Sequence, residues 1–175
     1  MKARRRVVSG LCLLTGIFLA GYARFSWVRA HAPMPSSVVR LGKALPPLLV
    51  VDASGRIVDV GKASLGSRSV IVFYSASCRV CQAVLPELQP FPHALRLLLV
   101  SEEAGSSSEA PKTLGSDQAL RFYDRNRVLS RSFSMSGLPT ILFVDESGVL
   151  RDGLVGEHAR GLLQKKLKEF SAGSP

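Results

Sequence analysis

Cysteine and tryptophan are scarce in this chain, which has three cysteines and one tryptophan among its 175 residues. So few cysteines exclude a zinc site made of four thiolates. Histidine does not supply the missing ligands, because His31, His93 and His158 are scattered along the sequence. A structural zinc site, or any other resident metal, is therefore not predicted.

Acidic residues are absent from the N-terminal part of the chain. Residues 1–40 contain seven Lys/Arg side chains and no Asp or Glu, although the whole chain has a formal net charge of +10. The remaining residues hold the other sixteen basic side chains and all thirteen acidic ones. This mildly basic body has no basic stripe interleaved with aromatic residues, so binding of nucleic acid is not predicted.

The excess of basic residues in the N-terminal part surrounds a stretch without charges. Residues 7–23 contain no charged side chain, and four of the basic residues precede them. This pattern is typical of an export signal or a membrane anchor whose N-terminus stays inside the cell while the body lies outside. An uncleaved anchor is the preferred interpretation. Cleavage after Ala32, in the small-x-small sequence Ala30-His31-Ala32, is the alternative.

Cys78 and Cys81 are separated by two residues and follow the apolar, β-branched run Val70–Tyr74. The residues after the run predict a helix, which places the pair on its first turn. Unpaired backbone N–H groups and the helix dipole stabilise a thiolate there. Thiol–disulfide exchange is therefore the leading hypothesis. A purely structural disulfide is the alternative, but in the chain-entropy model such a short loop gives the smallest stabilisation.

A second motif, Leu138-Pro139-Thr140, precedes the apolar run Ile141–Val144. A proline that opens a strand cannot donate a hydrogen bond to the sheet. A cis bond before Pro139 would turn the Leu138 backbone toward a neighbouring group, whereas a trans bond is the commoner case for any single X-Pro pair. The motif is weak by itself and becomes specific when it occurs together with the upstream dithiol.

The two motifs resemble those of the thioredoxin superfamily, and within it the membrane-anchored, TlpA-like thiol–disulfide oxidoreductases of the bacterial envelope. The resemblance covers roughly residues 46–170. It implies that Cys78 is the exposed nucleophile and Cys81 the resolving thiol. It also implies that Pro139 is the cis-proline facing them, with Leu138 and Thr140 positioning the partner, and that Pro86 is the proline of the first helix. A narrower similarity is to the thioredoxin-like maturation protein of methylamine utilisation.

This resemblance implies an enzyme that exchanges its dithiol or disulfide with thiols or disulfides of partner proteins, without a bound cofactor. It also implies an inner-membrane protein with its domain in the periplasm, a membrane redox partner and a role in maturing an exported enzyme. The competing hypothesis is a Cu(I) metallochaperone, in which Cys78 and Cys81 bind the metal with His158 or Met135. Related copper chaperones usually space the cysteines one residue wider, which counts against it.

Departures from the family pattern concern the surroundings of the dithiol. Ser77 stands where thioredoxins usually have tryptophan, Val72 where they have a buried acid, and Val84 where some envelope reductases have glutamate. An obvious carboxylate to relay protons is therefore missing. Arg79 is predicted to tune the acidity of the dithiol by stabilising the Cys78 thiolate, which would make the disulfide more oxidising. A solvated surface arginine is the alternative.

The expected fold is an α/β thioredoxin-like sandwich, a central mixed sheet flanked by helices with an N-terminal β-hairpin extension. Residues 1–30 are expected to form the anchor or signal segment, 31–45 a linker and 46–171 the domain. Strands are predicted at residues 48–51, 57–60, 69–74, 95–100, 141–144 and 149–155. Helices are predicted from about residue 78, at 117–123, and at the C-terminus with Leu162, Leu163, Leu167 and Phe170 facing inward.

Overall fold

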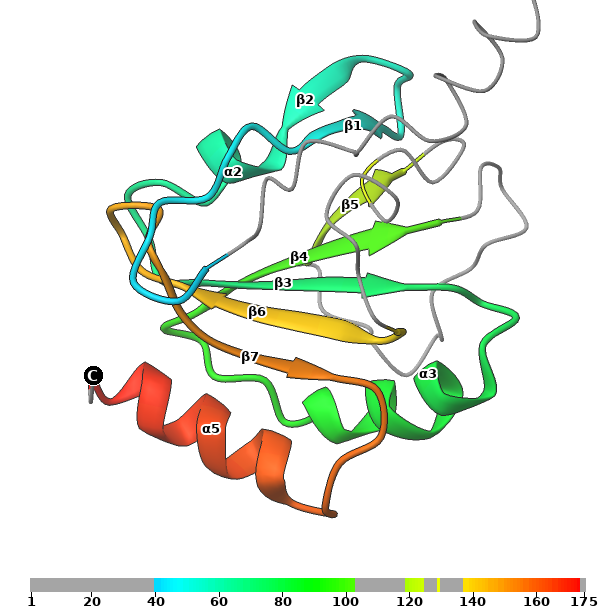
Figure 1. Ribbon diagram of the computed structural model, residues 1–175, viewed down its shortest axis with the longest axis vertical. Coiled ribbons are helices and arrows are strands. Elements are labelled where there is room, and N and C mark those ends of the chain that lie inside the picture. Colours follow the sequence, from blue (N-terminus) through cyan, green and yellow to red (C-terminus); the bar gives the residue numbers. More distant parts are fainter. Residues whose placement is uncertain (1–39, 103–118, 125–128, 130–136, 174–175) are drawn as a thin grey trace, which may run out of the picture. The chain divides into compact units, whose positions relative to one another are not determined.

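The computed structural model describes residues 40–102, 119–124, 129 and 137–173. Its centre is a seven-stranded mixed sheet with the strand order β2-β1-β5-β4-β3-β6-β7 (Figure 1). The strands are β1 Leu49–Asp52, β2 Ile57–Asp59, β3 Ser69–Tyr74, β4 Arg96–Ser101, β5 Ala119–Tyr123, β6 Thr140–Val144 and β7 Leu150–Val155. The β1-β2 pair is the predicted N-terminal hairpin. The predicted α/β thioredoxin-like fold is confirmed.

The central strand β3 has the bounds expected from its run of β-branched and aromatic residues, and all six of its residues are buried. It pairs in parallel with β4 and antiparallel with β6. Because Phe73 lies opposite Thr140, the end of β3 and the beginning of β6 meet at one edge of the sheet. This register brings the dithiol, which follows β3, close to the proline motif, which precedes β6.

Alternate residues of the strands point to opposite faces of the sheet and build two separate cores. One core packs β3, β4 and β6 against the helices α3 (Arg79–Val84), η1 (Leu85–Leu88) and α5 (Leu162–Ser171), which lie on the same side of the sheet (Figure 1). The predicted inner residues Leu163, Leu167 and Phe170 are buried in it, whereas Leu162 is only half-buried. The other core includes Val50, Phe73 and Phe122.

The helix that carries the dithiol begins after Cys78, continues through η1 with Pro86 near its start, and ends at Leu88. It therefore ends before Pro90, and a proline cannot continue the helical hydrogen bonds. The Gln89-Pro90 bond is cis, which the sequence did not predict.

The helix predicted at residues 117–123 is wrong in the part that the structure describes, where residues 119–123 form β5. This strand pairs in parallel with β4 and antiparallel with β1. The backbone of β5 therefore pairs with a strand on each side. Phe122 packs in the second core, while Leu120 stays exposed. Pairing with neighbouring strands outweighs the helix-like spacing of its apolar residues.

A short helix, α2 (Val60–Ala63), follows β2 where the sequence predicted only the end of the hairpin. Asp59 caps it, because its carboxylate accepts hydrogen bonds from the backbone N–H groups of Gly61 and Lys62. The cap ends the second hairpin strand one residue earlier than expected.

The predicted anchor at residues 7–23 and most of the linker at 31–45 lie outside the described residues. The last linker residues pack on the domain, since Ala44 bridges Val149 and the Leu45 N–H donates to Gly148 O at 2.9 Å. Within the part of the chain that the structure describes, no helix has the length and hydrophobicity needed to cross a membrane. The sequence also predicts a loop over residues 102–112 and a turn over residues 128–133, and both lie almost entirely outside the described residues.

Candidate active site

Cys78 lies at the N-cap of α3, directly after the loop Ser75–Ser77 that leaves β3. Its Sγ accepts a hydrogen bond from the Cys81 N–H at 3.2 Å, and its thiol donates to the Leu138 carbonyl at 3.8 Å. An N-cap side chain satisfies a backbone donor that has no partner inside the helix. Because a charged acceptor makes the stronger hydrogen bond, this position favours the thiolate of the half-exposed Cys78.

Cys81 lies on the first turn of α3 and is fully buried in the core beneath the helices. Burial, a hydrogen bond to Cys78 and the negative charge of Cys78 raise the pKa of the Cys81 thiol to about 12. Both cysteines are free in the structure. Cys81 is therefore a neutral thiol near neutral pH, held next to an accessible sulfur.

The proline motif faces this pair. The Leu138-Pro139 bond is cis, as the resemblance implied, and Pro139 is buried. The Pro139 carbonyl accepts from the Gly156 N–H at 2.8 Å, and the Thr140 hydroxyl donates to the Gly137 carbonyl at 2.7 Å. These bonds fix the segment on both sides. Leu138, Pro139 and Thr140 thus lie at the same edge of the sheet as Cys78, with the Leu138 carbonyl in contact with it.

A polar network surrounds the loop before Cys78, and sequence reasoning assigned it no role. The hydroxyls of Ser75 and Ser77 are 2.8 Å apart, and the Cys78 N–H donates to the Ser75 carbonyl at 3.2 Å. The side-chain amide of Gln82 donates to the Ala76 carbonyl at 2.8 Å. The only sequence signal for this last bond is a long amide side chain one turn into the helix.

Arg79 is the first residue of α3 and is exposed beside Cys78 in the sequence. Within the described residues it forms no ion pair or hydrogen bond through its side chain, so its guanidinium is directed to solvent. Val72 and Val84, which replace the family's carboxylates, are both buried in the core that contains Cys81. The surroundings of Cys81 at these two positions are therefore apolar.

The metal hypothesis finds limited support. The described residues include no group of three or more His, Cys, Asp or Glu side chains that could hold a metal ion. His158 is directed elsewhere, with Nδ1 3.2 Å from the Gly156 carbonyl and Nε2 3.9 Å from the Glu87 carboxylate. Met135 lies outside the described residues. Among the proposed Cu(I) ligands that the structure describes, Cys78 and Cys81 lie together, whereas His158 makes its contacts elsewhere.

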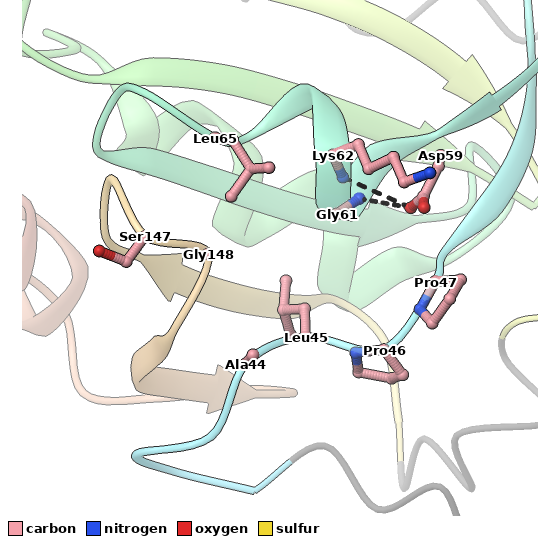
Figure 2. A pocket seen from close by; sticks show the side chains of 10 residues that line it. All are labelled: Ala44, Leu45, Pro46, Pro47, Asp59, Gly61, Lys62, Leu65, Ser147 and Gly148. Atoms are coloured by element: carbon pink, nitrogen blue, oxygen red, sulfur yellow. Dashed lines mark hydrogen bonds between the residues drawn. The ribbon is translucent and has the colours of Figure 1, made fainter.

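A small pocket of about 170 Å³ lies at the opposite edge of the sheet (Figure 2). It is lined by Ala44, Leu45, Pro46, Pro47, Asp59, Gly61, Lys62, Leu65, Ser147 and Gly148. One carboxylate oxygen of Asp59 already accepts three backbone N–H groups, from Leu48, Gly61 and Lys62. The lining of this pocket contains no thiol or imidazole.

Comparisons with known proteins found relatives that cover most of the chain. No protein-family model matches the chain. Over 139 residues the chain is 22% identical to the thiol-disulfide oxidoreductase ResA of Bacillus anthracis, covering 76% of this chain and 80% of ResA.

Solved structures show the same fold. A crystal structure assigned as a thiol:disulfide interchange protein DsbE from Chlorobium tepidum superposes with a TM-score of 0.62 at 17% identity, covering 77% of this chain and 99% of that one. The exposed lipoprotein thioredoxin Etrx1 of Streptococcus pneumoniae has a TM-score of 0.50 at 18% identity, covering 71% and 99%. At low identity, but over most of its length, the chain is similar to thiol–disulfide oxidoreductases of the ResA kind, and it has the thioredoxin-like fold of the DsbE-type structure.

Proposed function

We propose that this thiol–disulfide oxidoreductase uses Cys78 as its nucleophile and Cys81 as its resolving thiol, in exchange with disulfides or thiols of partner proteins in the cell envelope. The observation that supports this best is the contrast between the two sulfurs. Cys78 is half-exposed and touches the Leu138 carbonyl, whereas Cys81 is fully buried one helical turn further on. A partner can reach only the first sulfur directly.

Exchange then takes two steps. The Cys78 thiolate attacks one sulfur of a partner disulfide, the partner S–S bond breaks, and its other sulfur leaves as a thiolate. Next, Cys81 gives up its proton to the departed partner thiolate and attacks Cys78 Sγ, which breaks the mixed disulfide and releases the second partner sulfur. The partner gains two electrons and the dithiol becomes a disulfide. The same steps in reverse oxidise a partner dithiol.

The structure offers a physical reason for the second step. Two of the causes that raise the pKa of Cys81 come from Cys78, namely a hydrogen bond to its sulfur and its negative charge. Both disappear when Cys78 is bound in a neutral mixed disulfide, and burial is the cause that remains. Cys81 therefore becomes more acidic at the stage when it must act, without a carboxylate at position 72 or 84 to take its proton.

Leu138, Pro139 and Thr140 would hold the partner chain beside Cys78. Leu138 is half-buried and packs against both cores, so its carbonyl has a fixed position 3.8 Å from Cys78 Sγ. A partner backbone lying along this segment would bring its own sulfur next to Cys78. The rigid anchoring of Pro139 and Thr140 supports such a docking role.

For location, we propose an inner-membrane anchor at residues 7–23 with the domain in the periplasm. The charge asymmetry around this segment supports it, and one structural neighbour is an exposed lipoprotein. The first described residues join the domain next to the turn after β6, at the edge opposite to Cys78. The partners of the domain would be an exported enzyme and a membrane redox protein that regenerates the dithiol or the disulfide.

The decisive experiment is capture of the mixed disulfide. Cys81→Ser in the full chain should accumulate partner proteins bound through Cys78, seen as reducible complexes on gels and identified by mass spectrometry. The matched variant Cys78→Ser should accumulate none. Capture by Cys78→Ser alone would reverse the roles of the two cysteines, and identification of one exported enzyme would support a maturation role.

Fractionation of cells tests the location. The full chain should remain with membranes. A thiol reagent that cannot cross the inner membrane should label the domain in cells whose outer membrane has been permeabilised. A soluble exported form that begins near Pro33 would show cleavage of the N-terminal segment. A domain that is labelled only after lysis would contradict the periplasmic location.

A further inference from the structure

The loop before the dithiol, Ser75–Ser77, is short and polar, and it makes local hydrogen bonds. The Cys78 N–H binds the Ser75 carbonyl, and the hydroxyl of Ser75 binds Ser77. Gln82 is different, because its side chain crosses from the first turns of α3 to the Ala76 carbonyl, six residues earlier, at 2.8 Å. Its own backbone N–H also donates to the Cys78 carbonyl at 3.1 Å. Gln82 thus binds the chain on both sides of Ser77.

We propose that Gln82 is a positioning residue for thiol–disulfide exchange, whose amide holds the loop Ser75–Ser77 against α3 and keeps Cys78 in the N-cap position. The proposal rests on the function proposed above. Gln82 itself is exposed and touches neither sulfur in a hydrogen bond, so it acts through the loop.

The position of Cys78 Sγ depends on the backbone that Gln82 holds. Cys78 has the extended N-cap dihedrals φ −81° and ψ 114°, from which its sulfur accepts the Cys81 N–H at 3.2 Å. Ala76 lies two residues earlier, so rotation of the peptide groups in between changes where Cys78 points. Release of the Ala76 carbonyl would weaken the bond from the Cys81 N–H. Since that bond is stronger to a thiolate than to a thiol, the thiolate would lose stability.

The test uses Gln82→Met in the full chain, because methionine has a similar length and cannot donate a hydrogen bond. The alkylation rate of Cys78, followed by mass spectrometry from acid to alkaline pH, should fall about fivefold at neutral pH, and the rate profile should move to higher pH. A fivefold change corresponds to about 1 kcal/mol, the usual net contribution of one hydrogen bond. The equilibrium with glutathione should shift toward the disulfide by a similar factor.

Gln89→Met is the matched control. Gln89 is also exposed and lies at the end of η1, seven residues further along, where its backbone N–H binds the Pro86 carbonyl. This variant should alkylate and equilibrate like the original chain. Thermal unfolding of both variants in the disulfide form should show that they are folded.

An unchanged rate profile and an unchanged glutathione equilibrium in Gln82→Met would overturn the proposal. If the unfolding temperature then fell, Gln82 would be a structural residue only. Capture of partners by Cys81→Ser is a separate measurement, so its failure would contradict the proposed function while the reactivity of Cys78 still reports on Gln82.

Discussion

The two edges of the sheet use their polar groups in different ways. At the edge of the sheet that contains the turn after β6, Asp145 accepts hydrogen bonds from the N–H groups of Ser147 and Val149, both at 2.9 Å. It also accepts one from Arg151 at 2.7 Å. Asp59 holds three backbone N–H groups nearby. At the dithiol edge, Cys78 and the Leu138 carbonyl face each other where a partner can reach them. Charged side chains stabilise the turns at one edge, whereas the chemistry proposed for the other edge relies on sulfur and backbone groups.

The pKa shifts at the two edges run in opposite directions. Burial by itself would raise the pKa of Asp145, but hydrogen bonds from Val149, Arg151 and Ser147 outweigh burial and hold that pKa below its usual range. For Cys81, burial and Cys78 act together and raise the pKa. At neutral pH, Asp145 is therefore a charged acceptor for backbone N–H groups, and Cys81 is a neutral thiol.

The largest expected effect comes from removing the exposed sulfur. Cys78→Ser should reduce exchange with a disulfide substrate to the uncatalysed background, because Cys81 is buried and cannot be reached first. Its unfolding free energy should change by only about 0.5 kcal/mol, since the hydroxyl still caps the helix. Substrate reduction and chemical denaturation measure the two effects. Residual exchange through Cys81 would contradict the division of roles.

Removing a carboxylate at the other edge should have the reverse effect. Asp145→Ala should lower the unfolding free energy by about 2 kcal/mol, because two backbone N–H groups lose their acceptor, and should leave the exchange rate of the folded protein unchanged. The neighbouring Glu146→Ala is the control. Its ion pair with Arg68 is partly exposed, so the loss should be about 0.5 kcal/mol. A slower exchange in Asp145→Ala would show that the two edges are coupled.

How much of this contrast the sequence predicts depends on how far apart the interacting residues lie in the sequence. The bounds of β3 and the placement of Cys78 at a helix start follow from local patterns, a β-branched run and the spacing of two cysteines. The contact between Cys78 and Leu138 is predicted only through the family resemblance, because the two residues lie 60 positions apart in the sequence.

Features that depend on interactions between distant segments were not predicted from the sequence. Strand β5 exists because β4 and β1 lie on either side of it, and residues 119–123 contain no clear alternation that would indicate a strand. The hydrogen bond from Gln82 to Ala76 has no periodic signature. The cap that Asp59 provides could have been predicted, since an aspartate before Val60 is a common helix start.

The raised pKa of Cys81 predicts a pH dependence confined to the reduced protein. A group whose pKa is raised by folding, here from 9.0 to about 12, binds more protons in the folded state within this interval. The unfolding free energy of the reduced form should therefore fall as pH rises from 9.0 to about 12, by roughly 1.4 kcal/mol for each pH unit.

Chemical denaturation at several pH values checks this dependence. Reduced Cys81→Ala is the control, because lysines and tyrosines titrate alike in both proteins and only the difference between them reports on Cys81. Equal pH dependence of the two proteins would contradict the raised pKa. In Cys78→Ser, two of the causes of the raised pKa are removed, so the pKa of Cys81 should lie below about 12.

The smallest expected effect concerns Arg79, the charged residue that follows Cys78 in the sequence. Arg79 is exposed, and a guanidinium keeps its proton at ordinary pH, so it should stabilise the Cys78 thiolate and with it the reduced form. Arg79→Val should therefore shift the equilibrium with glutathione toward the disulfide by about threefold, equivalent to a potential about 15 mV lower.

Salt and a matched variant show whether this effect is electrostatic and local. The shift caused by Arg79→Val should shrink as ionic strength rises, because salt screens exposed charges over about 10 Å at 0.1 M. Lys62→Val removes an exposed cation beside the pocket at the opposite edge and should leave the equilibrium unchanged. If the two variants behave alike, Arg79 is only a solvated charge. The backbone N–H of Cys81 would then be the group at this edge that favours the thiolate, and the oxidising bias expected from the arginine would be absent.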